Sequence, residues 1–267
     1  MATEYSGRGD PARSIELMWG VQDRPRRGPK PRLTVEQVVQ TAIRVADADG
    51  LAALSMRRVA DELSVTAMSL YTYVPGKAEL LDLMLDRVCA ETAKPAEVPG
   101  GWRARLELVA RENFALYQRH PWMLQVGTSR PSLGPNLVAK YDYELRAVAG
   151  LGLTEIEMDQ LVTLAADYVY GAVRSAVEAA QVEKHTGQTD QQWWESYAPA
   201  LEKVLDPGRY PLAATVGAAA GEAYGAAADP ARAFDFGLQR VLDGIEAYVE
   251  ARRASTPRPA DQAEAGR

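Results

Sequence analysis

The stretch SMRRVADELSVTAMSLYTYVPGK, residues 55–77, decides the fold predicted for this chain. Ser55 is placed to cap a short helix, and Thr66 to cap a second one that runs over 67–74 until the pair Pro75-Gly76 ends it. The first helix carries apolar residues at helical spacing: Met56, Val59, Ala60 and Leu63. Two short helices joined by a turn of about three or four residues are typical of a helix-turn-helix motif.

The second of these helices is predicted to present one face outward. On a helical wheel Ala67, Met68, Tyr71 and Thr72 fall within an arc of ~140°, whereas Leu70 points away from that arc toward the core. In a helix-turn-helix the second helix enters the major groove of DNA. There Met68 or Ala67 suits a thymine methyl group, and the Thr72 hydroxyl suits a base edge. The alternative is an αα-corner whose tyrosines pack on the core.

Residues 64–77 contain one lysine and no acid, although the chain as a whole has a net charge of −6. Side chains that suit phosphate oxygens are Ser69, Tyr71, Tyr73 and Lys77. Lys77 also begins the next helix, where free N–H groups and the helix dipole favour an anion. The stretch therefore predicts a surface that meets a polyanion.

Helical patterns continue on both sides of this stretch. Upstream, Thr34 and Gln37 have capping-box spacing, and Gly50 is placed to end the helix that they begin. Downstream, helices are expected at 77–93, 101–119, 134–150, 154–184, 190–205 and 231–253, with a helical turn at 121–126. The alternation typical of strands is absent. The Ala and Gly content of 206–230 favours a loose connection, with helix possible in part of it.

Composition narrows the class of protein. The chain has 267 residues, of which 47% are hydrophobic, enough for a substantial core. Cys89 is the only cysteine, so we expect it to be a small apolar helix residue in a cytoplasmic protein without disulfides. Neither a signal peptide nor an apolar run long enough to cross a bilayer is present. His120 and His185 lack metal-ligand spacing, and the sequence has no catalytic or dinucleotide motif, so we expect no metal, no cofactor and no enzymatic activity.

Residues 33–84 closely resemble the DNA-binding domain of TetR-family transcriptional regulators. The matching segments are the Ala-rich first helix that ends in DADG, then LSMRRVADEL, then LYTYVPGKAELL. Ser64 departs from the family pattern, which usually has Gly there, and a left-handed turn would cost a non-Gly residue ~1 kcal/mol. The resemblance implies DNA contacts by these residues: Arg57, Thr66, Ala67, Met68, Ser69, Tyr71, Thr72, Tyr73 and Lys77.

A basic strip lies just upstream of this domain. RPRRGPKPRL, residues 24–33, resembles the N-terminal extensions of actinobacterial members of the family. We expect an arm carrying Arg26, Arg27 and Lys30 to lie in the adjacent minor groove. The alternative is a flexible tail that attracts DNA through charge alone.

Residues 120–154 resemble a tetracycline-repressor-type C-terminal domain, through the turn RPSLGPN and the link GLGLT. With the resemblance, the predicted fold is all-α: an N-terminal three-helix helix-turn-helix domain and a larger helical domain that binds a ligand and dimerises. The expected divisions are a flexible basic extension at 1–32, the DNA-binding domain at 33–80, the regulatory domain at 81–253 and a disordered tail at 254–267.

A homodimer is expected because one helix-turn-helix buries little surface on DNA, and half-sites commonly lie ~34–36 Å apart. A four-helix interface is predicted from the two helices at 154–184 and 231–253 through Val169, Val173, Val177, Phe234, Leu238, Val241, Leu242 and Ile245. The alternative is that these residues pack within one chain.

The predicted ligand pocket is apolar and aromatic. Its candidate lining residues are Phe114, Tyr117, Trp122, Met123, Tyr141, Tyr168 and Trp194. Asp167 and Arg174 are seven residues apart on one helix and would supply polar anchors or a salt bridge if buried. The alternative for each pocket candidate is plain packing in the core. The leading hypothesis is a repressor that a small-molecule effector releases from a palindromic operator. The alternatives are an architectural DNA-binding protein without an effector, and an enzyme with an appended helix-turn-helix.

Overall fold

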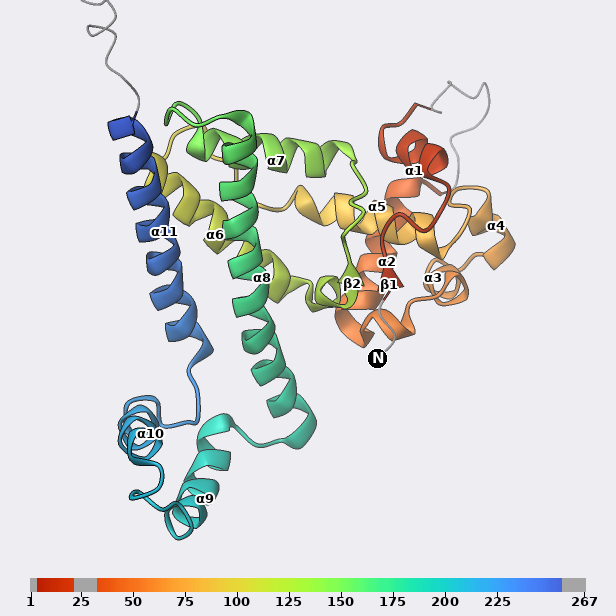
Figure 1. The fold of residues 1–267 in the computed structure, drawn as a ribbon. Helices are drawn as coiled ribbons and strands as arrows, with labels where there is room; N and C mark the ends of the chain where they lie inside the picture. Colours follow the sequence, from red (N-terminus) through yellow and green to blue (C-terminus); the bar gives the residue numbers. More distant parts are fainter. Residues whose placement is uncertain (1–3, 22–32, 256–267) are drawn as a thin grey trace, which may run out of the picture. The chain divides into compact units, whose positions relative to one another are not determined.

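A computed structural model describes residues 4–21 and 33–255 of the chain (Figure 1). This part of the chain holds helices α1–α11, two 3-10 turns and two strands of two residues each. The prediction of an all-α fold is therefore confirmed. The described residues form two compact units, one made of those up to Ala166 together with those from Gly244 onward, and the other of Asp167–Asp243.

The helix-turn-helix domain predicted at 33–80 contains α2 (Val35–Asp49), α3 (Met56–Glu62) and α4 (Ala67–Tyr71). The three predicted N-caps are present: Thr34 forms a capping box with Gln37, Ser55 accepts the Arg58 N–H, and Thr66 accepts the Ser69 N–H. The 3-10 turn η1 (Leu51–Ala53) follows Gly50, whose φ of 81° ends α2.

The second helix of the motif, α4, is shorter than the predicted 67–74. α4 ends at Tyr71, because the backbone N–H groups of Tyr73 and Val74 both bond to the Leu70 carbonyl and fold the chain back. Pro75 disfavours a helical conformation at the residue before it. Leu70 and Val74 are each 0% exposed, so the early end of the helix buries both side chains.

The N-terminal residues depart from the expected flexible extension. Glu4–Tyr5 form strand β1, which pairs in parallel with β2 (Val126–Gly127), and Pro11–Met18 form helix α1. Asp10 caps α1 by accepting the N–H groups of Ala12 and Arg13, and Pro11 occupies the first helical position. The Asp-Pro pair was the available sequence signal for this helix.

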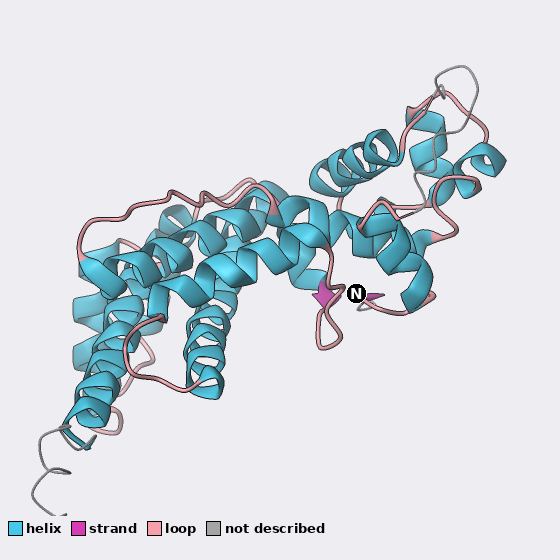
Figure 2. Cartoon of the chain, turned by 90° about the horizontal axis from the view of Figure 1, so that it is seen from above, coloured by secondary structure: helices cyan, strands magenta, loops and turns pink. Residues whose placement is uncertain are grey.

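Helix α5 (Lys77–Cys89) is the centre of the first unit. Its residues from Glu79 to Asp86 are all buried, and it packs against α1, α2 and α7 (Pro135–Val148). Asp86 of α5 caps α7 by accepting the backbone N–H groups of Asn136 and Leu137 at 3.0 and 2.8 Å. Helix α6 (Gly101–Arg119), the 3-10 turn η2 (Pro121–Gln125) and part of α8 (Glu155–Thr186) complete this unit. Figure 2 shows the helices of the chain from above.

The second unit contains the end of α8, then α9 (Asp190–Glu202), α10 (Pro211–Tyr224) and the start of α11 (Pro230–Ser255). Helix α10 lies in the segment for which a loose connection was favoured. Pro at its first position and Gly225, in the left-handed conformation at its end, define a helix that alanine stabilises. Trp194 of α9 packs over Gly221 of α10, where an added Cβ would lie 2.8 Å from the indole.

Candidate nucleic-acid interface and effector cavity

Helix α4 presents the outward face that its sequence predicts. Met68 is 77% exposed and Tyr71 is 47% exposed, whereas Leu70 is fully buried. Ser69 and Thr72 are also exposed, and Ala67 and Tyr73 are half-buried against the domain core. The face therefore combines apolar and hydroxyl groups with no acid within 64–77.

The hydroxyl groups of this face are held by bonds within α4 and its two capping residues. The oxygens Thr66 Oγ1 and Ser69 Oγ lie 2.9 Å apart, and Thr72 Oγ1 donates to the Ser69 carbonyl oxygen at 2.7 Å. Because the Thr72 proton is engaged, its hydroxyl in this rotamer can only accept from a base, as from the amino group of adenine or cytosine.

The left-handed turn expected at Ser64 is present. Its φ is 54°, and it is the one described non-Gly residue with positive φ. Leu63, half-buried, and Ser64 together redirect the chain between α3 and α4. The backbone strain at this position is thus tied to the angle at which α4 is presented.

The two adjacent arginines of α3 differ in their partners. Arg58 pairs with Asp49 at 3.3 Å and with Glu62 at 2.9 Å. Arg57 is exposed and has no ion pair within the described part of the chain. Arg57 is therefore the better placed of the two to reach DNA.

Lys77 begins α5, and its ammonium group bonds to Glu4 Oε1 at 3.0 Å. Both side chains are about one-third exposed, at 34% and 35%. The lysine expected to hold a phosphate is thus paired with a carboxylate of β1. The arm residues Arg26, Arg27 and Lys30 lie outside the described residues.

A cavity of about 190 Å³ lies inside the first unit. Its walls come from α5, α6, α7 and α8, from η2, from the residue after β1 and from the loop after β2. The lining residues are Ser6, Leu85, Cys89, Asn113, Leu116, Tyr117, Met123, Thr128, Pro131, Ser132, Leu137, Lys140 and Ala166.

One end of this cavity is polar. The buried Asn113 donates its amide N–H to Glu144 Oε1 at 2.8 Å, and Lys140 donates to the same oxygen. Burial raises the pKa of the Cys89 thiol to about 11, although the charge of Lys140 opposes this shift. Cys89 therefore stays protonated at neutral pH and forms part of the apolar wall, as its sequence context predicted.

Of the predicted pocket residues, Tyr117 and Met123 line this cavity. Asn113, Lys140 and Ser6 were missed. The spacing of Lys140 and Glu144 by four helical residues was the only pattern that could have drawn attention to this polar end.

The other predicted pocket residues have different surroundings. Phe114 is half-buried outside the lining, and the Tyr141 hydroxyl donates to Asp159 Oδ1 at 2.6 Å on the surface. In the second unit Asp167 and Tyr168 line a separate hollow, and Trp194 packs on α10. Asp167 and Arg174 are exposed, so they are not the buried polar anchors that would hold a ligand. Arg174 instead pairs with Glu178 at 3.1 Å.

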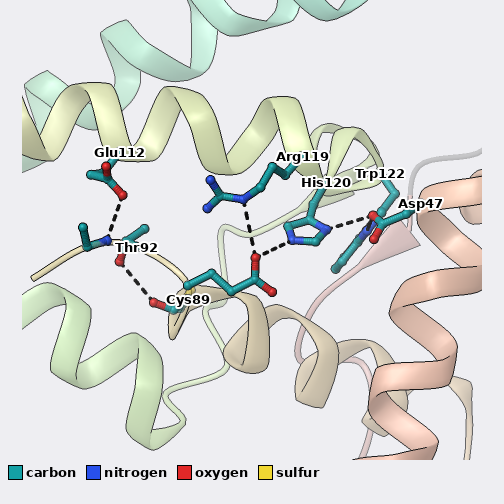
Figure 3. A network of polar contacts seen from close by, with 9 residues as sticks. Asp47, Cys89, Thr92, Glu112, Arg119, His120 and Trp122 are labelled. Atoms are coloured by element: carbon teal, nitrogen blue, oxygen red, sulfur yellow. Dashed lines mark hydrogen bonds and ion pairs between the residues drawn. The ribbon is translucent and has the colours of Figure 1, made fainter.

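Trp122 belongs to the hydrophobic core that α2–α5 share with the end of α6 and η2, because its side chain is 1% exposed and its indole N–H donates to Asp47 Oδ1 at 2.8 Å. The same Asp47 oxygen bonds to His120 Nδ1 at 2.8 Å, and His120 Nε2 bonds to Glu91 Oε2 at 3.0 Å (Figure 3). Arg119 also faces Glu91, at 3.5 Å. This network joins the end of α2 to the ends of α5 and α6.

The residues predicted for a dimer interface are already covered within one chain. Val241 is half-buried, and the other seven are buried: Val169, Val173, Val177, Phe234, Leu238, Leu242 and Ile245. In the second unit Tyr168 of α8 stacks on Phe234 of α11 with ring centroids 6.0 Å apart. These side chains therefore form internal packing, and a second copy would have to use other faces of α8 and α11.

Two further properties concern the described part of the chain alone. None of its helices has the length and apolar character needed to span a membrane. It also holds no group of three or more His, Cys, Asp or Glu side chains arranged to bind a metal ion.

Comparison with known proteins identifies the family. Residues 38–84 match the family of bacterial regulatory proteins called the tetR family, and residues 94–249 match the tetracyclin repressor-like C-terminal domain. The HTH-type transcriptional repressor DrrR1 of Streptomyces coeruleorubidus is 50% identical over 256 residues, which cover 96% of this chain and 93% of that protein.

Solved structures of ActR from Streptomyces coelicolor have the same fold. The apo form is 27% identical with a TM-score of 0.68 and covers 84% of this chain and 99% of that one. The complex with actinorhodin is 26% identical with a TM-score of 0.67, over 81% and 96% of the two chains. With both domains matched in order along the sequence, the chain belongs to the TetR family of bacterial transcriptional regulators.

Proposed function

We propose that this protein is a homodimeric transcriptional repressor that binds a palindromic DNA operator and leaves it when a small molecule occupies the cavity of the first unit. The observation that carries the proposal is the face of α4, where exposed Met68 and Tyr71 stand among hydroxyl groups and no acid occurs within 64–77. Such a face fits a major groove and its phosphates. Repression follows the name of the relative that is 50% identical.

The cavity supports the effector part of the proposal. It has apolar walls and a polar end at Asn113 and Lys140, the combination that small-molecule sites usually have. ActR has been solved with actinorhodin and with (S)-DNPA, which are small molecules bound to a related fold. Leu85 and Cys89 of α5 line the cavity, and Lys77 begins the same helix. If α5 can adopt two positions and an effector binds more tightly to one of them, the difference in effector affinity sets the change in operator affinity.

The homodimer and the cytoplasmic location are parts of the same proposal. A palindromic operator requires two recognition helices related by twofold symmetry, and a single copy of this chain supplies one. Sedimentation of the purified protein, alone and with operator DNA, would measure the number of chains in each state.

Selection of random duplex DNA by the purified protein tests the DNA-binding proposal. We expect a palindromic consensus whose half-sites are separated by about one helical turn, ~34–36 Å. Recovery of DNA without any shared sequence would favour an architectural protein and contradict operator recognition.

Thermal melting against a panel of hydrophobic metabolites and antibiotics tests the effector proposal. A molecule that binds the folded state raises the melting temperature by mass action. An effector should also release the selected DNA. A compound that raises the melting temperature equally in wild type and in Asn113→Leu would be bound elsewhere.

A further inference from the structure

The N-terminal residues 4–18, which we call the strap, touch both the cavity and the lysine expected to hold DNA. Its first three residues form a tip against the loop after β2. The Ser6 hydroxyl bonds to the Arg130 carbonyl oxygen at 2.8 Å and lies 3.2 Å from that of Gly127, and the Ser6 N–H donates to the Gly127 carbonyl at 3.1 Å. Ser6 is also part of the cavity wall. The tip therefore depends on the same loop that closes the cavity.

The rest of the strap is fixed on α5. Asp82, which is 1% exposed, accepts the Gly7 N–H at 2.9 Å and the Ser14 hydroxyl at 3.0 Å. Glu79, 8% exposed, accepts the Asp10 N–H at 3.1 Å. If residues 7–18 moved away, two buried carboxylates would lose these hydrogen-bond donors, which would cost free energy. Residues 7–18 are therefore expected to stay in place when the tip moves.

The tip is joined to this fixed part by Gly7. Its φ is +67°, a backbone conformation that other residues rarely adopt. Glu4, at the far end of the tip, makes the ion pair with Lys77 at 3.0 Å. Because both side chains are partly exposed, this pair is weak and another anion can replace the carboxylate.

We propose that the strap tip competes with DNA: Glu4 stays paired with Lys77 until an operator phosphate displaces it. A small molecule in the cavity favours the Glu4–Lys77 pair, because it contacts Ser6 of the same tip. An effector that contacts Ser6 holds the tip against β2, which keeps the carboxylate on the lysine and opposes phosphate binding. The inference rests on the proposed function, since it assigns Lys77 to a phosphate and the cavity to an effector.

Replacement of the competing carboxylate tests the first half of this proposal. Glu4→Gln should bind the selected operator more tightly, by roughly two- to fivefold for each protomer, the effect of an exposed ion pair. Glu16→Gln removes the same charge from the same strap, where Glu16 pairs with Arg13 at 3.4 Å. An equal gain in both variants would overturn the proposal, because it would show a general charge effect.

A double-mutant cycle identifies the partner. In a Lys77→Gln background the Glu4→Gln change should have no further effect on operator affinity, because the two residues act through one contact. The same gain with and without Lys77 would contradict competition for that lysine. The cycle is run at one salt concentration, since salt alters all phosphate contacts.

A reversible cross-link tests movement of the tip. Tyr5 and Gly127 are paired across β1 and β2, and the Tyr5 ring lies over Gly127, where an added Cβ would be 2.8 Å from it. The double variant Tyr5→Cys, Gly127→Cys should form a disulfide that holds Glu4 beside Lys77. Buried Cys89 can stay, because its thiol is inert.

The oxidised form should bind operator more weakly than the reduced form, and a reductant should restore binding. Equal affinity of the two forms would overturn the requirement for tip movement. The single variant Tyr5→Cys controls for loss of the ring. If wild type selects no DNA, the proposed function fails; if it selects DNA but Glu4→Gln and the cross-link have no effect, only the strap proposal fails.

Discussion

His120 and Asp47 are bonded through Nδ1 and Oδ1 at 2.8 Å, which joins the C-terminal end of α6 to the end of the first helix of the DNA-binding domain. His120 is 6% exposed and also bonds to Glu91. Burial lowers the pKa of the imidazole, but the hydrogen bonds and charges of Asp47 and Glu91 together raise it above its ordinary value. The contact between the two domains therefore favours the protonated histidine.

The raised pKa gives His120 a predictable effect on stability. A group whose folded pKa is raised stabilises the protein fully below its unfolded pKa, about 6.5, and the contribution is lost as pH rises through the folded value. We expect His120→Gln to be less stable than wild type at about pH 5.5, with a smaller difference at about pH 8.5. Urea unfolding at both pH values measures it. The exposed His185→Gln is the control, and a difference that does not change with pH would contradict the assignment.

Tyr71→Ala should lose operator affinity, roughly tenfold, if the hydroxyl bonds to a phosphate. The side chain is 47% exposed, so the fold and the oligomeric state should not change. Tyr210→Ala removes a tyrosine of equal exposure, 47%, from the start of α10 and should leave the affinity intact. Titration of labelled operator with each variant gives the comparison. Normal binding by Tyr71→Ala would mean that α4 does not lie in the groove.

Ser64→Gly should stabilise the protein by about 0.5–1 kcal/mol. The gain comes from release of the left-handed strain at φ 54°, less the greater freedom of glycine in the unfolded chain. Ala139→Gly, at an exposed position of α7, should instead cost about 1 kcal/mol. Thermal or urea unfolding of the three proteins measures both changes. A loss of stability in Ser64→Gly would show that the serine side chain outweighs the strain.

Trp122→Ala should lower the free energy of unfolding by about 3–5 kcal/mol, because a core indole and its bond to Asp47 are both removed. Met123→Ala, in the adjacent cavity wall, should change effector affinity as well as stability. Urea unfolding with and without an identified effector separates the two effects. If Trp122→Ala were as stable as wild type and failed only in effector binding, its placement in the core would be wrong.

Replacement of Arg26, Arg27 and Lys30 by Gln tests the basic arm. Each phosphate contact adds about 0.9 to the slope of log affinity against log salt concentration, so the slope should fall by up to about 2.7 for each protomer. Truncation of residues 1–30 would also remove the strap and would confuse the result. Arg146, Lys203 and Arg240 changed to Gln make the same difference in net charge on the exposed surface of the regulatory part. An unchanged salt slope would rule out the arm as a contact.

Local sequence signals predicted the DNA-binding domain well, because its caps and turns act over three or four residues. Thr34, Ser55 and Thr66 each cap the helix that follows, and Ser64 makes the turn. The length of α4 was overestimated, since burial of Val74 depends on tertiary packing.

The cavity could not be predicted in the same way. Its walls come from segments as far apart in sequence as Ser6 and Ala166, and aromatic content alone did not separate Tyr117 from the core residue Trp122. A stripe of apolar residues on α8 and α11 likewise indicated burial without indicating which surface would cover it, and the covering surface belongs to the same chain.

The acids of α5 determine where the DNA-binding domain of this protein can be replaced by that of another regulator in a chimeric biosensor. Glu79 and Asp82 hold the strap, and Asp86 caps α7, so one helix carries attachments both for the N-terminal strap and for a helix in the middle of the chain. If the DNA-binding domain is exchanged for that of another regulator and the junction lies inside α5, these acids are separated from their partners. Two junctions, one between the strap and α2 and the other at Gly76 before α5 begins, would transfer α2–α4 and leave all three attachments in the regulatory part.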